Sequence, residues 1–511
     1  MKVIGNDSQD GFIYGHANGA VSAGSPVVFN NNTSQVQSIS ATGASANVIS
    51  GTTFESDQAS NICSVFDKES GKLIIAYMDT ADTGKGKCVV ATPTASGFVY
   101  GPLSLFHSST GTAMYISITM VKDVDGVTSK VLVVYKRDTQ NHLSYRLGTV
   151  MSAGANTAAT VQWGKEDLQV VNSASTAVTS CAFDPIHQRV AVLQSTANQH
   201  QVAIGSVVGV RVIWYAQTNI HGSNGYTSAK LIFDDHSKQF IAFTGTSSEG
   251  RIIIFRIKTT DQNDIYHNSP GTFSGGATSN IDAVHVPNWN RNVFIYTDNQ
   301  GIGYAKTMVT ISGSQAGATA GYTIGGTSYW DGAGFANSSN SKIAYDTHRD
   351  KLLVTWTNGQ QNDYTYYTTG NLTNGDTLTW DAGGGSLLEG NIVRQDKDVQ
   401  YMDFGDAEKS GSFGIASTVG GGPGAAHIVE SNGTNLTPHS SFVGFAEGTS
   451  SNGEAVRIRS AGSIVGGLSG LLPGRKYYVY KDGTLKLAPE DRDFVVVAGT
   501  AISTTELLVM G

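Results

Sequence analysis

A short turn that begins at an aspartate and leads into an alternating apolar run recurs along the middle of this chain. In five copies a lysine or arginine follows the aspartate four or five positions later, as Lys72 follows Asp67 and Lys238 follows Asp234. The copies recur roughly every fifty to sixty residues, which is the period of a propeller blade of about four strands. The seven copies begin at Phe66, Lys122, Phe183, Phe233, His285, Tyr345 and Met402.

Each copy has the local chemistry of a β-hairpin. Aspartate can accept hydrogen bonds from the backbone two residues on and so opens a tight turn, and the basic residue is expected to keep its charged head in water. Period-two hydrophobicity follows, as in Val190 and Val192, and a second apolar run comes after a polar loop, as in 251–255. Each copy therefore predicts a small antiparallel sheet.

Sheets of this size cannot bury their apolar faces alone, so neighbouring copies must stack, and radial stacking also removes exposed edges. We therefore predict an all-β fold in which residues 51–435 form a six- or seven-bladed β-propeller. Seven blades fit the repeats best. Six blades result if the weak last copy, which is rich in glycine from 420 to 424, is a linker, or if a closing strand comes from the other end of the region.

The composition agrees with an all-β chain that has many turns. The sequence contains 61 glycines and 9% aromatic residues, and no window sustains a helical apolar stripe over three turns. Charged residues make up only 14% of the chain. A surface of neutral polar groups favours assembly with other proteins, because little charge has to be desolvated. A protein that must stay stable outside a cell is expected to have the same composition.

Several classes of function are disfavoured. The formal net charge is -8 with no cluster of lysine or arginine, so we predict no binding to nucleic acid. The first residues lack the apolar core of a signal peptide and no run is long enough to span a bilayer, so we predict neither secretion by the standard route nor membrane insertion. Cys63, Cys88 and Cys181 have no disulfide or metal spacing and are predicted to be buried apolar fillers.

The two ends differ from the repeats. Residues 15–40 and 442–511 consist of short apolar runs separated by tight turns, for example at Ser25-Pro26 and at Pro473-Gly474. The second segment resembles the C-terminal β-module of fibre-like and other virion proteins of marine tailed bacteriophages. The residues that carry this resemblance are 442–446, 469–471 ahead of Pro473-Gly474, 477–479, 482–485, 498–501 and 507–511.

The resemblance extends to the start of the chain and to the repeats. In that family a strand pair of the form Gly, spacer, Gly-Asp-Pro-Val, apolar residue, Asn precedes the module. Residues 20–30 fit this form, with Ser25 in place of the acidic residue. The repeats are similar to propeller-type repeats of phage and bacterial surface proteins.

The resemblance implies that residues 1–50 and 436–511 are two halves of one small β-domain into which the propeller is inserted. An insertion of this kind brings the two chain ends close together and is well tolerated by folded domains. One part would then dock and the other would be displayed. The alternative is a pair of independent terminal modules.

No motif of metal, cofactor or catalytic chemistry is complete. Asp123 and Asp125 stand at alternate positions, as in a calcium loop, but the further ligands of such a loop are missing and an ordinary turn is predicted. The histidines are scattered through different repeats, so zinc is not predicted. Turns such as 345–350 lack the form found in sialidase propellers, and neither a Gly-x-Ser-x-Gly elbow nor a phosphate loop is present.

Aromatic side chains are the stronger candidates for contact with a ligand, because sugar rings present apolar faces on which aromatic rings stack. The alternative for each is a filler between blades, since Trp163 and Trp356 already occur in strand-like sequence. The candidates for contact with a glycan are Trp289, Tyr329, Trp330, Tyr366 and Trp380.

Two classes of function follow. The first is a non-enzymatic structural protein on the surface of a bacteriophage particle, on the tail or its fibres or as a decoration of the capsid. Its partners would be other virion proteins, further copies of itself and glycans of the host surface. The second class is an enzyme that degrades glycans in the central funnel of the propeller. Carboxylate pairs alone do not identify such an enzyme, because the chain has 41 acidic residues to choose from.

Overall fold

The structure is a computed structural model, and two compact units can be separated in it. One unit comprises Met1–Ala44, Asp406–Lys409 and Asn432–Gly511, and the other comprises Ser45–Gly405 and Ser410–Ser431. The structure describes residues 12–17, 20–30, 35–38, 47–94, 97–108, 111–123, 125, 129–137, 142–151, 159–165, 168–171, 176–196, 199–222, 226–258, 264–311, 321–331, 338–347, 350–360, 362–373, 376–380, 386–388, 394–403, 412–419, 422–430, 442–451, 453–479, 484–487 and 496–510.

The larger unit is built from antiparallel sheets whose strands follow one another in sequence order. The first sheet comprises β5 (Ala59–Asp67), β6 (Lys72–Asp79), β7 (Lys85–Thr94), β8 (Gly97–Tyr100) and β9 (Ser104–His107). The second comprises β10 (Ala113–Lys122), β11 (Ser129–Arg137), β12 (His142–Met151), β13 (Thr160–Trp163) and β14 (Leu168–Val171). The third comprises β15 (Thr176–Asp184), β16 (Arg189–Thr196), β17 (Gln199–Val208) and β18 (Arg211–Gly222).

The remaining sheets repeat this pattern. The fourth comprises β19 (Tyr226–Asp234), β20 (Gln239–Thr246), β21 (Gly250–Ile257), β22 (Ile265–His267) and β23 (Gly271–Ser274). The fifth comprises β24 (Ser279–Val286), the short 3-10 helix η1 (Pro287–Trp289), β25 (Arg291–Thr297), β26 (Gly303–Ile311) and β27 (Gly321–Tyr329). The sixth comprises β28 (Ser338–Asp346), β29 (Lys351–Asn358), β30 (Tyr364–Thr373), β31 (Thr377–Trp380) and β32 (Ser386–Leu387), and the seventh comprises β33 (Arg394–Tyr401), β34 (Ser412–Val419), β35 (Gly424–Glu430) and β4 (Asn47–Glu55).

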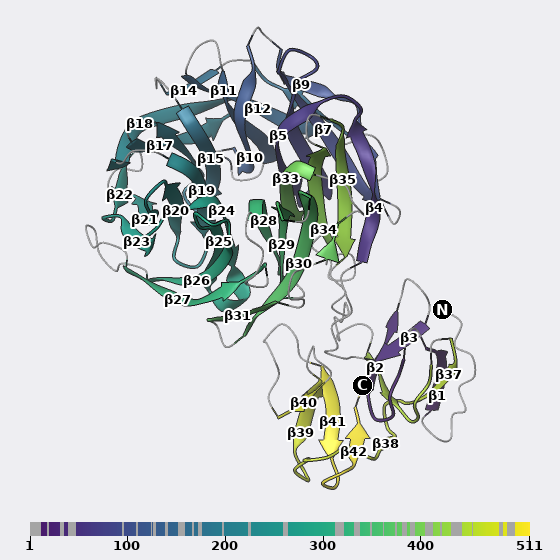
Figure 1. Ribbon diagram of the computed structural model, residues 1–511. Coiled ribbons are helices and arrows are strands. Elements are labelled where there is room, and N and C mark those ends of the chain that lie inside the picture. Colours follow the sequence, from purple (N-terminus) through teal and green to yellow (C-terminus); the bar gives the residue numbers. More distant parts are fainter. Residues whose placement is uncertain are drawn as a thin grey trace. The chain divides into compact units, whose positions relative to one another are not determined.

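These sheets form a closed ring, so the predicted β-propeller is confirmed (Figure 1). The first strand of each sheet contacts the first strand of the next, and β33 of the last contacts β5 of the first. The described residues thus give seven blades. The closing strand β4 does come from the other end of the region, but it completes the seventh sheet instead of reducing the number to six. β4 begins at Asn47, a few residues before the start at 51 that was expected for the propeller.

The aspartate turns have the predicted form. In the fourth sheet Asp234 Oδ1 accepts hydrogen bonds from the backbone N–H groups of His236 and Ser237, each at 3.0 Å. The aspartate then pairs with the first residue of the next strand at equivalent places in different blades. These pairs are Asp67 with Lys72, Asp184 with Arg189 and Asp346 with Lys351.

The expectation that the basic residue keeps its head in water is wrong for Lys72. This residue is 1% exposed, and its Nζ donates to Thr92 Oγ1 at 3.0 Å. The reason is that the second strand of a blade is covered on both faces, as every residue of β6 and β20 is buried. Burial lowers the pKa of Lys72.

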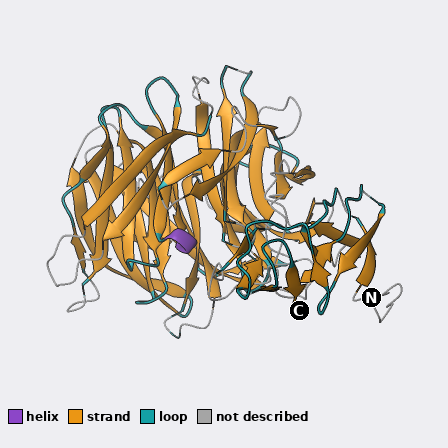
Figure 2. Ribbon diagram, turned by 90° about the horizontal axis from the view of Figure 1, so that it is seen from below, coloured by secondary structure: helices purple, strands orange, loops and turns teal. Residues whose placement is uncertain are grey.

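The smaller unit contains two five-stranded sheets, and strands appear almost everywhere in Figure 2. The first sheet has the order β1-β37-β36-β2-β3, and the second has the order β38-β42-β41-β39-β40. The first sheet comprises β1 (Phe12–His16), β2 (Pro26–Asn30), β3 (Gln35–Ser38), β36 (Phe442–Ala446) and β37 (Ala455–Arg459). The second comprises β38 (Ile464–Val465), β39 (Lys476–Val479), β40 (Leu485–Lys486), β41 (Val497–Ala501) and β42 (Leu507–Val509).

The first of these sheets is shared by the two ends of the chain, as expected. β2 pairs with β36 and β1 pairs with β37, so N-terminal and C-terminal strands alternate in it. A parallel bridge between Ala17 and Val36 closes the sheet on itself, and Val27, Val456 and Ile458 are buried in one apolar cluster with them. The second sheet packs against this one through a separate cluster to which β2 contributes Val28.

Candidate functional site

The aromatic candidates lie between the fifth and sixth blades, where most of them pack in the apolar core. Trp330 is 0% exposed, its ring centroid lies 4.9 Å from that of Trp356, and its Nε1 donates to Tyr304 O at 3.2 Å. A ring without exposed surface cannot stack on a sugar, so the expectation for Trp330 is wrong. Tyr329, the residue before it, is 44% exposed, whereas the other four candidates are half-buried or buried.

The other three candidates are half-buried against the same apolar cluster. Trp289 Nε1 donates to Asp350 Oδ2 at 2.6 Å, which ties η1 to the hairpin of the sixth blade. Tyr366 stacks on Trp356 at 5.8 Å with an interplanar angle of 25°. Trp380 Nε1 donates to Ser328 Oγ at 3.1 Å. Their polar and aromatic surfaces are therefore used inside the protein, which corresponds to the filler alternative.

Trp380 belongs to a recurring pair that joins adjacent blades. A glycine on the third strand faces a tryptophan on the fourth in three blades: Gly148 faces Trp163, Gly205 faces Trp214 and Gly370 faces Trp380. A Cβ on any of these glycines would lie less than 3.0 Å from the indole. Trp163 Nε1 reaches Ser104 Oγ of the preceding blade at 3.0 Å, just as Trp380 reaches Ser328. These pairs were not predicted from the sequence, although a fourth-strand tryptophan recurs in the repeats.

A cluster of alternating charge lies on the innermost strands of four consecutive blades. Lys230, Asp282, Lys342 and Asp398 each pair with the fifth residue of the second strand of their blade, so they occupy one level of the ring. Lys230 Nζ lies 2.7 Å from Asp282 Oδ1. We call these four residues the axial charge cluster. The cluster was not predicted from the sequence, because the four charges become neighbours only through the register of the blades.

The carboxylates of the axial charge cluster are already engaged. Asp282 Oδ2 accepts the backbone N–H of Ile343 at 3.0 Å, and Asp398 Oδ2 accepts both the N–H and the hydroxyl of Ser64 at 2.6 and 2.9 Å. Burial alone would raise the pKa of Asp282, but the ammonium groups of Lys230 and Lys342 outweigh it and lower that pKa. Burial would lower the pKa of Lys230, and the carboxylates of Asp282 and Asp398 raise it instead. The cluster contains two positive and two negative side chains, and its contacts join neighbouring blades.

The pKa values of the carboxyl groups matter for the alternative of a glycan-degrading enzyme, which needs a general acid. A glycosidase needs one carboxyl group whose pKa is raised, so that it remains protonated and can donate to the leaving group. In the described part of the chain, every carboxyl group with a shifted pKa has it lowered by hydrogen bonds or by a cation. These groups are Glu69, Asp234, Glu249, Asp264 and Asp282.

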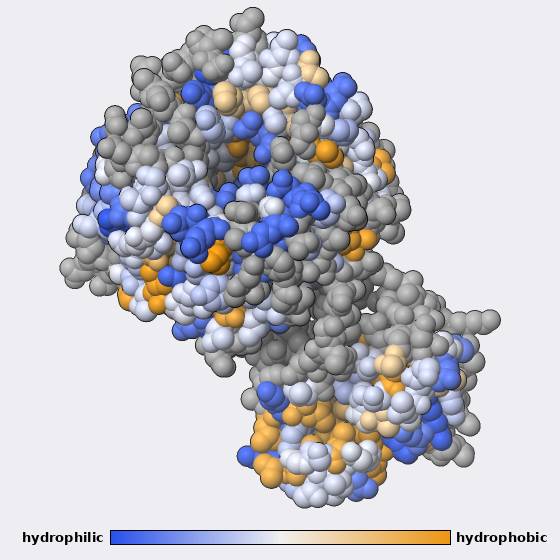
Figure 3. Space-filling view, in the orientation of Figure 1, coloured by the Kyte–Doolittle hydropathy of each residue, from blue (hydrophilic) through white to orange (hydrophobic). Residues whose placement is uncertain are grey.

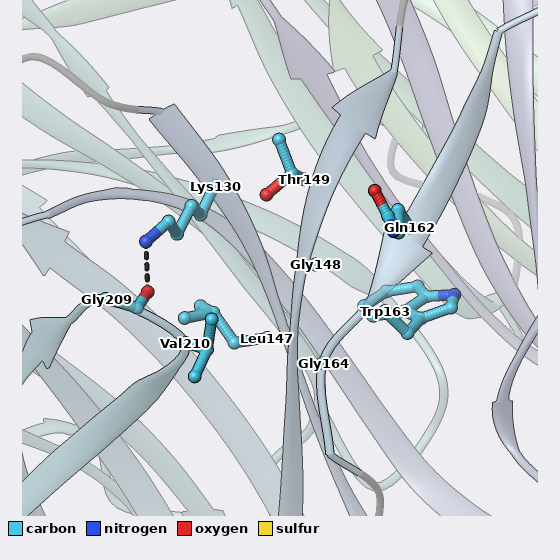
Figure 4. Close-up of a pocket in the computed structure, with 9 residues that line it drawn as sticks. All are labelled: Lys130, Leu147, Gly148, Thr149, Gln162, Trp163, Gly164, Gly209 and Val210. Carbon is cyan, nitrogen blue, oxygen red and sulfur yellow. Dashed lines mark hydrogen bonds between the residues drawn. The ribbon is translucent and has the colours of Figure 1, made fainter.

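One pocket of about 240 Å³ lies between the second blade and the β17–β18 hairpin of the third (Figure 4). Its polar groups include Thr149 and Gln162, but its cation is already neutralised: Lys130 Nζ donates to Asp123 Oδ2 at 2.7 Å and to Gly209 O. In Figure 4 the ring of Trp163 lies on the opposite side of the pocket from Lys130. The pocket is lined by Lys130, Leu147, Gly148, Thr149, Gln162, Trp163, Gly164, Gly209 and Val210.

The candidates for metal binding are explained by other contacts. Asp123 also accepts the backbone N–H of Gly209 at 3.0 Å. Its carboxylate therefore binds both Lys130 and the turn between β17 and β18. Val124 and Gly126 of the former calcium candidate, like His348, lie outside the described residues. No group of three histidine, cysteine or acidic side chains suited to a metal ion occurs among the residues that the structure covers. The three cysteines are free thiols, with Cys88 and Cys181 buried and Cys63 half-buried.

Comparisons with known proteins give a likeness of fold only. No family model matches the sequence, and no curated protein matches it. A protein from Lactobacillus plantarum is similar in structure with 10% identity and a TM-score of 0.42, over 72% of this chain and 96% of that one. The WD40 domain of Toxoplasma gondii coronin is similar with 8% identity and a TM-score of 0.43, over 80% and 89%. The propeller assignment therefore rests on the sheet order and the closed ring. Within the described residues, no helix has the length and hydropathy needed to cross a membrane.

Proposed function

We propose that this chain is a non-enzymatic structural protein on the surface of a bacteriophage particle, attached to the tail or its fibres. One observation carries the proposal. The two segments that resemble phage virion proteins, 20–30 and 442–446, lie more than four hundred residues apart, yet Val27 pairs with Gly444 and Val21 with Ser450. These two segments thus lie on neighbouring strands of one sheet, as expected if one module is interrupted by an inserted propeller.

The division of the chain supports separate roles for the two units. In the proposal the terminal unit docks on other virion proteins, and the propeller presents its loops to the host. A propeller offers a broad loop-lined face, which suits weak contacts whose avidity comes from many copies on one particle. Host glycans are the proposed ligand class, with Tyr329 as the remaining aromatic candidate because its ring is exposed.

A decoration of the capsid is the alternative within this class. The same poorly charged surface and the same terminal unit would serve on a capsid lattice. The tail is preferred because a displayed propeller suits contact with the host more than reinforcement of a shell.

A glycan-degrading enzyme is the alternative of a different class. It would use carboxylates on the inner strands of the propeller. Asp282 and Asp398 are the described carboxylates of the axial charge cluster, and both are engaged by backbone N–H groups, with a lysine on Asp282 as well. This arrangement supports a structural role for them and favours the first class.

Labelling of intact particles tests the proposal. Gold-labelled antibodies against the propeller should mark the tail or its fibres in electron micrographs. A variant that lacks residues 442–511 should lose its place on the particle but keep a folded propeller, because the terminal unit shares no sheet with it. Absence from all particles, together with release of reducing sugar that is lost in Asp282→Asn, would overturn the proposal in favour of the enzyme.

A further inference from the structure

The pocket between the second and third blades has a row of polar side chains along one wall. The register of the second blade places Lys130, Thr149 and Gln162 side by side across β11, β12 and β13. Side chains that stand opposite each other on neighbouring strands share one face of the sheet. All three residues line the pocket, as Figure 4 shows.

This wall keeps hydrogen-bonding groups that the protein does not use. Among the residues that the structure describes, neither the hydroxyl of Thr149 nor the side-chain amide of Gln162 forms a hydrogen bond with another protein group. An ammonium group has three donors, and Lys130 uses two of them on Asp123 Oδ2 and Gly209 O. One N–H, one hydroxyl and one amide therefore remain available to a ligand.

The opposite wall is the β17–β18 hairpin of the third blade, which ends in a small turn. Gly209 and Val210 form this turn, and no atom lies within 4 Å of a Cβ added to Gly209. The junction of the fifth and sixth blades is built differently. There Asp376, which precedes β31, pairs with Arg291 Nε at 3.0 Å and joins the two blades. At the pocket the hairpin presents no carboxylate, and a volume of about 240 Å³ remains open.

Charge and size narrow the class of ligand. The ammonium group of Lys130 lies 2.7 Å from the carboxylate of Asp123, so an anion would meet no uncompensated positive charge. Pockets for drug-sized ligands measure about 300–1,000 Å³, and this pocket is smaller, so it suits a single ring. Val210 is 73% exposed and gives the pocket an apolar lip. Figure 3 shows mainly hydrophilic residues on the visible face of the propeller, interrupted by small apolar spots.

We propose that this pocket binds the neutral, hydroxyl-rich sugar unit at the end of a glycan. Sugar hydroxyls donate and accept hydrogen bonds. The hydroxyl of Thr149 and the amide of Gln162 can do both, and Lys130 donates. The apolar lip at Val210 can pack against the C–H face of the ring. This inference rests on the proposed function, because it assigns a site on the second blade to the host glycans named there.

Titration of the full chain with methyl glycosides of glucose, galactose and mannose, followed by saturation-transfer NMR, tests the inference. At least one of these neutral probes should bind, and the anionic probe N-acetylneuraminic acid should not. Thr149→Val removes the hydroxyl with little change of shape and should weaken binding by about threefold to tenfold, which is the contribution of one hydrogen bond. The matched control is Thr327→Val, which changes an exposed threonine on β27 of the fifth blade and should leave binding unaltered.

A second variant guards against loss of folding. Gln162→Leu changes an exposed side chain and should weaken binding to a similar degree, with a wild-type melting temperature. A disaccharide with the bound hexose at its non-reducing end should bind at least as tightly as the methyl glycoside.

Four results would overturn the inference: no binding of any neutral probe, binding of the anionic probe alone, wild-type affinity in both pocket variants, or loss of binding when the hexose is extended to the disaccharide. A chain that is found on particles but binds no hexose would leave the proposed function intact. A chain that binds a hexose through Thr149 but is absent from particles would do the reverse.

Discussion

Lys397 is a lysine buried inside the propeller. It lies on β33, is 2% exposed, and donates from Nζ to Thr357 Oγ1. Burial lowers its pKa to about 7, although the carboxylate of Asp396 acts in the opposite direction. An unfolded chain keeps the ordinary pKa near 10.5, so below pH 7 the native state carries the full cost of a buried charge.

Lys397→Met should therefore stabilise the propeller at pH 7. Replacement of a buried charge by an apolar side chain of similar length is often favourable by about 1–4 kcal/mol. Between pH 7 and 10.5 the unfolded state binds the extra proton, so wild-type stability rises with pH and the advantage of the variant should shrink. Calorimetric melting temperatures at pH 7 and pH 10 measure this. An advantage that grows with pH would contradict the prediction.

His200 should make the propeller sensitive to acid. This residue is 0% exposed, its Nδ1 lies 2.6 Å from Ser195 Oγ, and its ring stacks on His221 at 6.3 Å. Burial, with a contribution from His221, lowers its pKa to about 3 from the usual 6.5. Between these values the unfolded state binds a proton that the native state does not, so stability falls as pH falls, by about 1.4 kcal/mol per pH unit.

His200→Gln should flatten the acid limb of the stability curve. Glutamine keeps a polar group near Ser195 but cannot take up a proton. The variant should lose some stability at pH 7 and show a smaller further loss than wild type between pH 6.5 and 4. Melting temperatures across that range give the comparison. Parallel curves for the two chains would show that another group governs the acid response.

At the scale of the element, the glycine–tryptophan pairs lock the outer strands of the blades. Gly370→Ala would place a Cβ 2.4 Å from Trp380 Cε3, and the indole cannot retreat without losing its bond to Ser328. Overpacking of this kind costs about 1–3 kcal/mol. Gly276→Ala is the matched control, because no atom lies within 4 Å of the added Cβ. Thermal unfolding should show the loss for the first variant alone, together with altered tryptophan fluorescence.

These elements also show how far sequence reasoning reaches. The hairpins were predictable because the turn at Asp234 is made by neighbouring backbone groups and the strand after it has a local period. The contacts between blades were not predictable in the same way. Trp380 was a candidate for sugar binding because sequence does not say that Ser328 of the preceding blade holds its indole. Lys230 and Asp282 stand fifty-two positions apart and meet only when two blades are in register.

At the scale of the whole molecule, β4 closes the ring. It supplies the outer strand of the seventh blade, where Glu55 pairs with Gly424 and Asn47 pairs with Glu430. Glu55 is 6% exposed, accepts the hydroxyl of Tyr77 at 2.9 Å and forms an ion pair with Lys87. β4 thus joins the end of the propeller segment to its beginning through backbone bonds and through a buried carboxylate.

Two fragments that differ only in this strand should therefore behave differently. A fragment of residues 45–431 keeps all strands of the ring and should unfold in one cooperative transition close to that of the propeller in the full chain. A fragment of residues 56–431 lacks β4. It leaves β35 as an uncovered edge and removes Glu55, which is the partner of the Tyr77 hydroxyl and one of two partners of Lys87. Its melting temperature should therefore fall by at least about 5 °C, and it should aggregate more readily. Equal melting temperatures would mean that the ring is held by the inner strands alone.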